Sequence, residues 1–186
     1  MRRMTTLVAL SALTVGITAP LAAQVSSSLQ SITLGATKGE SVTLGAPTPG
    51  TQTLTIVDNA LNPYATPFAI TVSWDVKNSS STVVNLVGYF ATPAQALANG
   101  TDYIAAGLVE VSTDAGTTWK PATSSAVNGI GSSGGSVVLF TSPVTQGEAK
   151  KGTKAVSFSV RLNLVGAPST SAGAYSGTLN LMAISK

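Results

Sequence analysis

Strict alternation of apolar and polar residues marks two segments of the chain as β-strands. From Phe68 to Lys77 every second residue is apolar, with small or polar residues between. The same pattern runs from Ala155 to Val165, where Phe158 and Leu162 are among the apolar positions. Successive side chains of a strand point to opposite faces, so this pattern predicts strands with one buried face.

Shorter β-rich segments, most of them bounded by Gly, Pro, Asn or Ser, fill much of the remaining chain. They are residues 31–34, 41–44, 52–57, 82–90, 108–113, 136–141 and 174–184. No long helical pattern separates them, which favours antiparallel pairing in two packed sheets. We therefore predict an all-β fold, a single antiparallel β-sandwich of immunoglobulin-like or jelly-roll type with about nine or ten strands.

Two connecting segments have their own patterns. Residues 92–97 predict one helical turn, with Thr92 as N-cap, Pro93 at the first helical position and Asn99-Gly100 ending it. We place this turn in a crossover between the sheets. Residues 128–135 form a Gly/Ser-rich stretch, whose composition predicts a flexible loop.

The first 23 residues have the organisation of a signal peptide. Arg2 and Arg3 precede an apolar stretch from Leu7 to Ile17, and small residues follow at Ala22 and Ala23. An uncleaved membrane anchor is the alternative, although the apolar stretch is shorter than the ~20 residues that span a bilayer. We expect residues 24–186 to be one exported β-sandwich domain without a membrane span, in the periplasm, at the cell surface or outside the cell.

The composition limits which catalytic and metal-binding chemistry the chain can perform. The chain has no His and no Cys, which excludes Ser-His-Asp and Cys-His catalysis, imidazole-dependent metal sites, thiolate chemistry and disulfides. Asp58-Asn59 and Asn99 with Asp102 offer oxygen ligands without the spacing of a calcium loop, and turn formation explains them. We therefore expect no cofactor, no metal and no enzymatic activity. A hydrolase built on carboxylates such as Glu110 and Glu148 remains a distant alternative.

The charge balance argues against nucleic acid as a partner. Once Arg2 and Arg3 leave with the signal peptide, eight basic residues stand against seven acidic ones. Lys150, Lys151 and Lys154 form one small cluster in a Gly-containing segment, which is typical of a solvated loop.

Residues 112–119 fit the pattern S-x-D-x-G-x-T-W, through Ser112, Asp114, Gly116, Thr118 and Trp119. An Asp side chain can bond amides across a turn, Gly supplies a positive φ, and Trp can fold over the hairpin. The segment resembles the Asp-box hairpin of sialidase-like propellers. The motif occurs once, and sialidase chemistry needs an arginine cluster where the mature chain has only Arg161. The resemblance therefore implies a structural hairpin and no hydrolase activity.

Residues 172–181 read A-G-A-Y-S-G-T-L-N-L. This segment is similar to the closing strand of spore coat protein U-like and other fimbrial-type subunits, and of cell-wall-binding domains of the WxL kind. The resemblance implies a non-enzymatic β-domain exposed at the envelope. It also implies assembly by strand donation, for which residues 25–36 are the candidate segment, with Leu29, Ile32 and Leu34 as its apolar positions. The alternative is that these residues form the first strand of their own domain.

Taken together, these features favour an exported, non-catalytic structural or adhesive subunit of the cell envelope. A surface with few charges suits packed assemblies, because little charge must be desolvated when subunits meet. We expect self-association or binding to another envelope protein. The alternative is a monomeric carbohydrate-binding module that uses the loop aromatics Tyr64, Tyr103 and Trp119.

Overall fold

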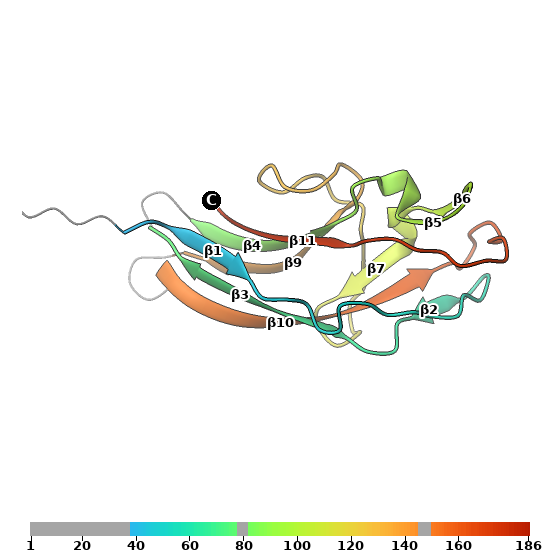
Figure 1. The fold of residues 1–186 in the computed structure, drawn as a ribbon, viewed down its shortest axis with the longest axis horizontal. Helices are drawn as coiled ribbons and strands as arrows, with labels where there is room; N and C mark the ends of the chain where they lie inside the picture. Colours follow the sequence, from blue (N-terminus) through green and yellow to red (C-terminus); the bar gives the residue numbers. More distant parts are fainter. Residues whose placement is uncertain (1–37, 78–81, 145–149) are drawn as a thin grey trace, which may run out of the picture. The chain divides into compact units, whose positions relative to one another are not determined.

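The fold is all-β and antiparallel. A computed structural model describes residues 38–77, 82–144 and 150–186 (Figure 1), and within them eleven strands form two larger sheets and one hairpin. The predicted signal peptide, the predicted strand at 31–34 and the candidate donor positions Leu29, Ile32 and Leu34 lie outside the described residues.

The larger sheet is built around the long strand β10. Its order is β1-β3-β10-β7-β8, and the short strand β2 also pairs with β10. β3 pairs with the first half of β10, while β2 and β7 pair with its second half. The bounds are β1 Ser41–Leu44, β2 Leu61–Pro63, β3 Phe68–Asp75, β7 Val109–Ser112, β8 Lys120–Pro121 and β10 Lys151–Asn163.

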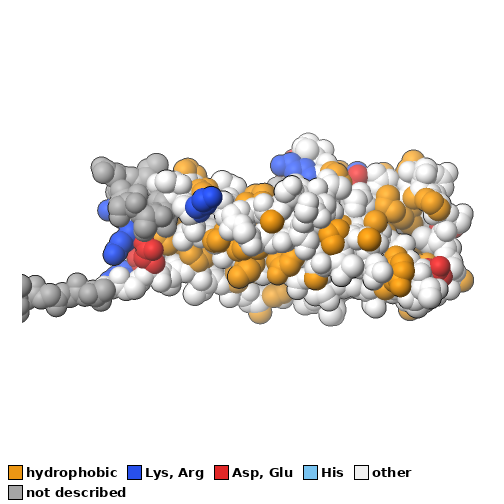
Figure 2. All heavy atoms as spheres, turned by 90° about the horizontal axis from the view of Figure 1, so that it is seen from above, with side chains coloured by type: hydrophobic (Ala, Val, Ile, Leu, Met, Phe, Trp, Pro, Cys, Tyr) orange, Lys and Arg blue, Asp and Glu red, His pale blue; other side chains and the backbone are white. Residues whose placement is uncertain are grey.

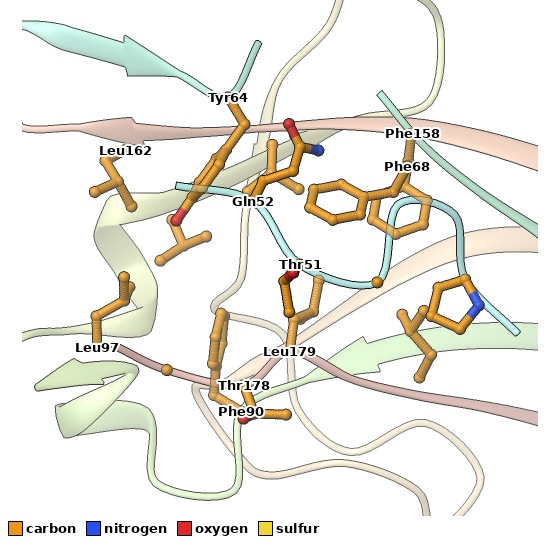
Figure 3. Close-up of a pocket in the computed structure, with 16 residues that line it drawn as sticks. Thr51, Gln52, Tyr64, Phe68, Phe90, Leu97, Phe158, Leu162, Thr178 and Leu179 are labelled. Carbon is orange, nitrogen blue, oxygen red and sulfur yellow. The ribbon is translucent and has the colours of Figure 1, made fainter. Parts of the chain in front are cut away.

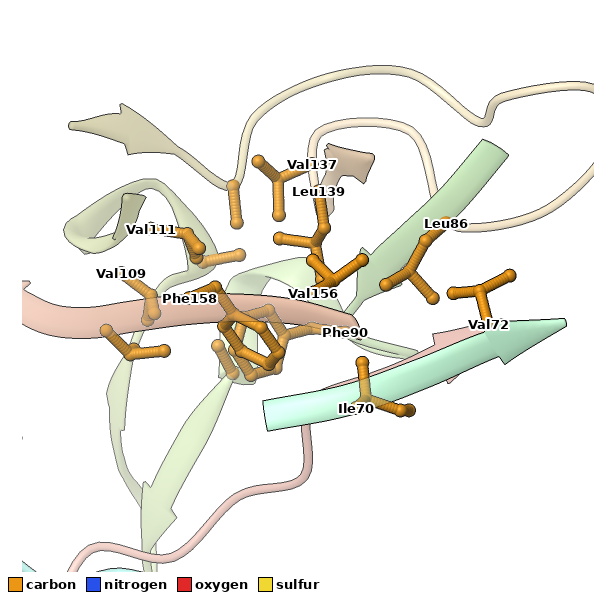
Figure 4. Close-up of a cluster of buried hydrophobic side chains, with 14 of the residues drawn as sticks. Ile70, Val72, Leu86, Phe90, Val109, Val111, Val137, Leu139, Val156 and Phe158 are labelled. Atoms are coloured by element: carbon orange, nitrogen blue, oxygen red, sulfur yellow. The ribbon is translucent and has the colours of Figure 1, made fainter. Parts of the chain in front are cut away.

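The smaller sheet has the order β11-β4-β9. β4 spans Val83–Tyr89, β9 spans Ser136–Pro143 and β11 spans Asn180–Ser185. A separate hairpin consists of β5 (Leu97–Asn99) and β6 (Asp102–Ile104). The sheets enclose one hydrophobic core, part of which is shown in Figure 4.

The core confirms the alternation of the two strongest sequence patterns. Ile70, Val72 and Trp74 of β3 are buried, and so are Val156 and Phe158 together with the later even-numbered apolar positions of β10. The residues between them remain exposed or half-buried. One-sided burial is therefore what imposes the two-residue period on these strands.

β4 is buried on both faces. Val84 and Leu86 belong to the core, and Asn85 and Val87 on the other face are also buried. The Asn85 side-chain oxygen is satisfied there, because it accepts a hydrogen bond of 2.9 Å from the Thr141 hydroxyl. Burial on both faces explains why residues 83–87 lack strict alternation.

The predicted helical turn is a 3-10 helix at Pro93–Gln95. Thr92 is its N-cap residue, although the Thr92 side chain makes no capping hydrogen bond. The turn lies in the connection from β4 of the smaller sheet to β7 of the larger one, where a crossover was expected. A further 3-10 helix at Ala106–Leu108, in the same connection, was not predicted.

Other expectations need correction. Residues 52–57 are not a strand, and of the predicted strand 174–184 only β11 forms a ladder. The short strands β2, β5, β6 and β8 were not predicted. The loop at 128–135 is ordered, because Ile130 is buried and Val127 and Ile130 exchange backbone hydrogen bonds of 2.7 and 2.9 Å.

Candidate functional site

The main hollow of the described residues lies between the two sheets, and we call it the inter-sheet cleft. It consists of an apolar hollow of about 250 Å³ and a more polar one of about 560 Å³, which share Gln52, Tyr64, Leu97 and Leu162. One rim is the segment 51–56, and the other is formed by residues 170–175 and 177–179. Figure 3 shows the apolar part.

The first rim has the side-chain alternation of a strand but forms no ladder among the described residues. Gln52, Leu54 and Ile56 are half-buried and the residues between them are exposed, which is the alternation of a strand. Within the described residues, however, the backbone of residues 51–56 forms no hydrogen bond. The side chains are placed as in a sheet, and the backbone groups are left unpaired.

Two amide side chains hold this rim in place. The Gln52 side chain donates to the Thr66 carbonyl at 2.5 Å and accepts from the Thr66 amide at 3.1 Å. At the other end, the buried Asn62 side chain accepts from the Val57 amide at 2.7 Å and donates to the Val57 carbonyl at 3.0 Å. These side-chain bonds fasten both ends of the segment, while the backbone of residues 51–56 stays unpaired among the described residues.

The second rim also carries unpaired backbone. Ser176 exchanges hydrogen bonds of 2.8 and 3.0 Å with Ala98, and β11 begins its pairing with β4 at Asn180. Between these points, residues 177–179 form no backbone hydrogen bond within the described part of the chain. Among the described strands, β11 itself lies at the edge of its sheet and pairs on one side only.

Aromatic and aliphatic side chains line the cleft between the rims. Phe68 and Phe158 from the larger sheet stack with ring centroids 5.5 Å apart, and Tyr64 meets Phe68 edge-on at 6.3 Å. Figure 3 shows Phe90 and Leu179 approaching the same space from the opposite side. Burial raises the pKa of the Tyr64 hydroxyl, in keeping with this apolar setting.

The polar end of the cleft lies beneath the loop 165–176, which is fastened by two aspartates. Asp58 accepts hydrogen bonds from the Thr170 amide at 3.0 Å and the Thr170 hydroxyl at 2.7 Å, and these bonds lower the pKa of Asp58. Asp102 accepts from the Ser171 hydroxyl, which also lies 3.1 Å from the Tyr175 hydroxyl. The two acids therefore stabilise a loop.

The predicted Asp-box residues come together in the β7–β8 hairpin. Asp114 accepts from the Ser112 hydroxyl at 2.7 Å and from the Thr118 amide at 2.8 Å. Gly116 has φ +88°, and its amide donates to the Ser112 hydroxyl at 2.8 Å. The Trp119 ring nitrogen donates to the Gly116 carbonyl at 2.9 Å. This network closes the turn on itself.

Beside the hairpin lies a charged cluster that sequence reasoning missed. Arg161 and Glu110 face each other across β10 and β7, with Nη2 and Oε2 2.6 Å apart. Asn163 donates to the other oxygen of Glu110 at 2.9 Å. Arg161 also lies over the Trp119 ring, with Cζ 4.1 Å from its centroid. No sequence signal indicates this cluster, because it depends on the register that sets Arg161 of β10 opposite Glu110 of β7.

The candidate sugar-binding aromatics lie on three different elements. Tyr64 follows β2 and lines the cleft, Tyr103 is exposed on β6, and Trp119 is covered by Arg161 in the hairpin. The structure thus places only Tyr64 in the main hollow.

The described residues contain no group of three or more acidic, His or Cys side chains that could hold a metal ion, and no helix among them is long and apolar enough to cross a membrane. Comparison with family models, with curated proteins and with solved structures finds no match to this chain. Chemically, the cleft offers apolar side chains between two rims of unpaired backbone, a combination that fits an extended peptide.

Proposed function

We propose that this protein is an exported, non-catalytic structural or adhesive subunit of the cell envelope, which assembles by accepting a strand from another copy in the inter-sheet cleft. The observation that carries the proposal is the pair of rims at 51–56 and 177–179, which expose unpaired backbone on both sides of an apolar hollow. An added strand would satisfy these groups and fill the hollow at the same time.

The proposed donor is the segment 25–36 of a second copy. Ile32 and Leu34 are two residues apart, as a strand requires for side chains that enter the same row of pockets. Leu29 falls on the opposite parity and would face away from that row. The segment carries no charged residue, so no charge would be desolvated in the apolar hollow.

The test uses the chain from residue 24. Ile32→Asn with Leu34→Asn puts amides into the proposed pockets, while Ser31→Asn with Thr33→Asn makes the same change on the opposite parity. Size-exclusion chromatography with light scattering and negative-stain imaging report the assemblies. We expect discrete oligomers or fibres for the parent chain and the 31/33 variant, and their loss in the 32/34 variant.

A parent chain that stays monomeric at all concentrations would contradict the proposal, as would oligomers equally abundant in both variants. The monomeric outcome would favour the carbohydrate-binding alternative, for which a glycan screen with Tyr64→Ala is the next measurement. Circular dichroism of both variants verifies that each is folded.

A further inference from the structure

Charged side chains of residues 38–186 gather toward two opposite ends of the sandwich. Strands β1, β3, β10 and β11 meet at one end, where the described chain begins (Figure 1). The loop 165–176, β2 and the β5–β6 hairpin form the other. Figure 2 shows most of its blue atoms toward the first end and a red side chain at the second.

The first end, which we call the lysine end, is rich in positive charge. Lys38 pairs with Asp75 on the neighbouring strand, and Lys151 is the register partner of Asp75 on the other side. Its exposed lysines are Lys38, Lys77, Lys150, Lys151, Lys154 and Lys186. Against them stand Glu40 and Asp75. Positive charge is therefore in excess among the described residues of this end.

The opposite end, which we call the aspartate tip, is negative and partly apolar. Asp58 and Asp102 are exposed there, and no Lys or Arg occurs within residues 51–66, 93–108 or 162–176. Val57, Leu61 and Val165 are also exposed at this tip, where the Leu164 amide donates to the Ala60 carbonyl at 3.0 Å. Two exposed aspartates without a nearby lysine or arginine among the described residues suit a positively charged partner surface.

We propose that the lysine end of one copy docks on the aspartate tip of the next, so that copies of this chain join head to tail. The inference rests on the proposed function for its partner, since it names which faces of two subunits meet. Complementary charge is what selects this orientation, because tip against tip and lysine end against lysine end both juxtapose like charges. Such a contact does not close on itself, and repeating it yields a filament.

The same docking brings the proposed donor to its acceptor. Residue 37 is bonded to Lys38, so the N-terminal segment leaves from the lysine end. Asp58 and residues 170–175 of the aspartate tip line the polar end of the cleft. A lysine end seated on this tip therefore brings Lys38 within reach of the partner's cleft, since residues 24–37 can span about 45 Å when extended.

Exposed ion pairs are individually weak and are screened by salt, so the docking must depend steeply on ionic strength. The test measures association of the chain from residue 24 by sedimentation velocity in low and in high NaCl. Lys150→Glu, Lys151→Glu and Lys154→Glu are combined in one variant, because no side-chain partner of these lysines is found among the described residues. Lys120→Glu, away from both ends on β8, is the control.

We expect the triple variant to associate at least about ten-fold more weakly than the parent at low salt, with the difference vanishing at high salt. The Lys120→Glu variant should match the parent. Zero-length carbodiimide cross-linking of mixed isotope-labelled and unlabelled protein provides a second readout. Cross-links between copies should join Asp58 or Asp102 to Lys150, Lys151 or Lys154, and circular dichroism confirms that the variants fold.

Equal association of the triple variant and the parent, or cross-links between copies that leave out both aspartates, would overturn the docking. Repeating the salt series in the Ile32→Asn, Leu34→Asn background separates the two proposals. Salt-dependent docking that survives there supports the end-to-end contact even if strand donation fails. Assembly that needs Ile32 and Leu34 but ignores the lysine substitutions retains strand donation and removes the end-to-end contact.

Discussion

Arg161 is held between a carboxylate and an aromatic ring. Its Nη2 lies 2.6 Å from Oε2 of Glu110, and its Cζ lies 4.1 Å from the centroid of the Trp119 ring. Glu110 belongs to β7, Arg161 to β10 and Trp119 to the hairpin that follows β7. One side chain therefore joins the middle of the larger sheet to the hairpin at its edge.

Replacing Arg161 by alanine should destabilise the protein. Glu110 would lose its ion pair while its side chain is only 14% exposed, and Trp119 would lose its cover. We expect the free energy of unfolding to fall by about 2 kcal/mol, below the full cost of breaking a buried pair because both side chains retain some exposure. Urea unfolding measures the change. Lys120→Ala, on an exposed position, should stay within about 0.5 kcal/mol of the parent.

Asn62 should matter for the first rim of the cleft. Its side chain bonds both backbone groups of Val57 and the Ala60 carbonyl, and the residue is buried. Asn62→Leu leaves these groups without partners, at a cost of about 2 kcal/mol. Asn62→Asp keeps the acceptor for the Val57 amide but sets a carboxylate oxygen against the Val57 and Ala60 carbonyls, so it should also destabilise the protein. Hydrogen exchange at Val57 should accelerate in the leucine variant, and an unchanged rate there would contradict this role.

Position 177 requires glycine because the backbone at Ala96 lies close to it. A Cβ at this position would meet the Ala96 carbonyl oxygen at 1.9 Å, so Gly177→Ala must displace the second rim. We expect a loss of about 1–3 kcal/mol, as for other forced overpacking. Thermal unfolding and the exchange rates of the Ala98 and Ser176 amides report it. Gly39→Ala is the matched control, since nothing lies within 4 Å of its Cβ; equal effects of the two substitutions would refute the prediction.

The hairpin should have its own acid transition. Hydrogen bonds from the Ser112 hydroxyl and the Thr118 amide lower the pKa of Asp114 from 3.8 to about 2. Because the folded pKa is depressed, the stabilisation is complete above pH about 4 and is lost as the pH falls through about 2. NMR titration of the Asp114 carboxyl carbon should give a midpoint near 2, and Thr118 amide protection should fall in the same range. Asp114→Asn removes the titration, and a midpoint near 3.8 would show that the carboxylate is not held.

Much of the fold could be predicted from the sequence because burial on one face imposes a two-residue period on β3 and β10. The β-rich composition of residues 52–57 also predicted a strand, and this prediction was wrong in one respect only. Gln52, Leu54 and Ile56 do turn inward, but no backbone pairs with the segment among the described residues. Alternation reports which way side chains point, and pairing depends on neighbours that are distant in sequence.

The cleft was far less accessible to sequence reasoning. Among its lining residues, Tyr64 had been a candidate for sugar binding, and Asp58 had been explained by turn formation. Phe90, Phe158 and Leu179 come from three separate segments, and each looks like an ordinary core residue in its own segment. The Asp-box residues could be found because the hydrogen bonds that close the turn fall within eight consecutive residues, whereas the cleft is a product of topology.

The open edge of β11 bears on how readily the protein aggregates. Sheet edges in soluble proteins are usually protected by lysines, prolines or bulges. β11 carries no charged residue and no proline, and Met182 on it is 47% exposed. An isolated copy therefore presents a template on which any extended, unfolded chain can condense. Ordered assembly and amorphous aggregation both use the same row of amides and carbonyls. Which of them occurs depends on how quickly the edge is covered after the chain folds.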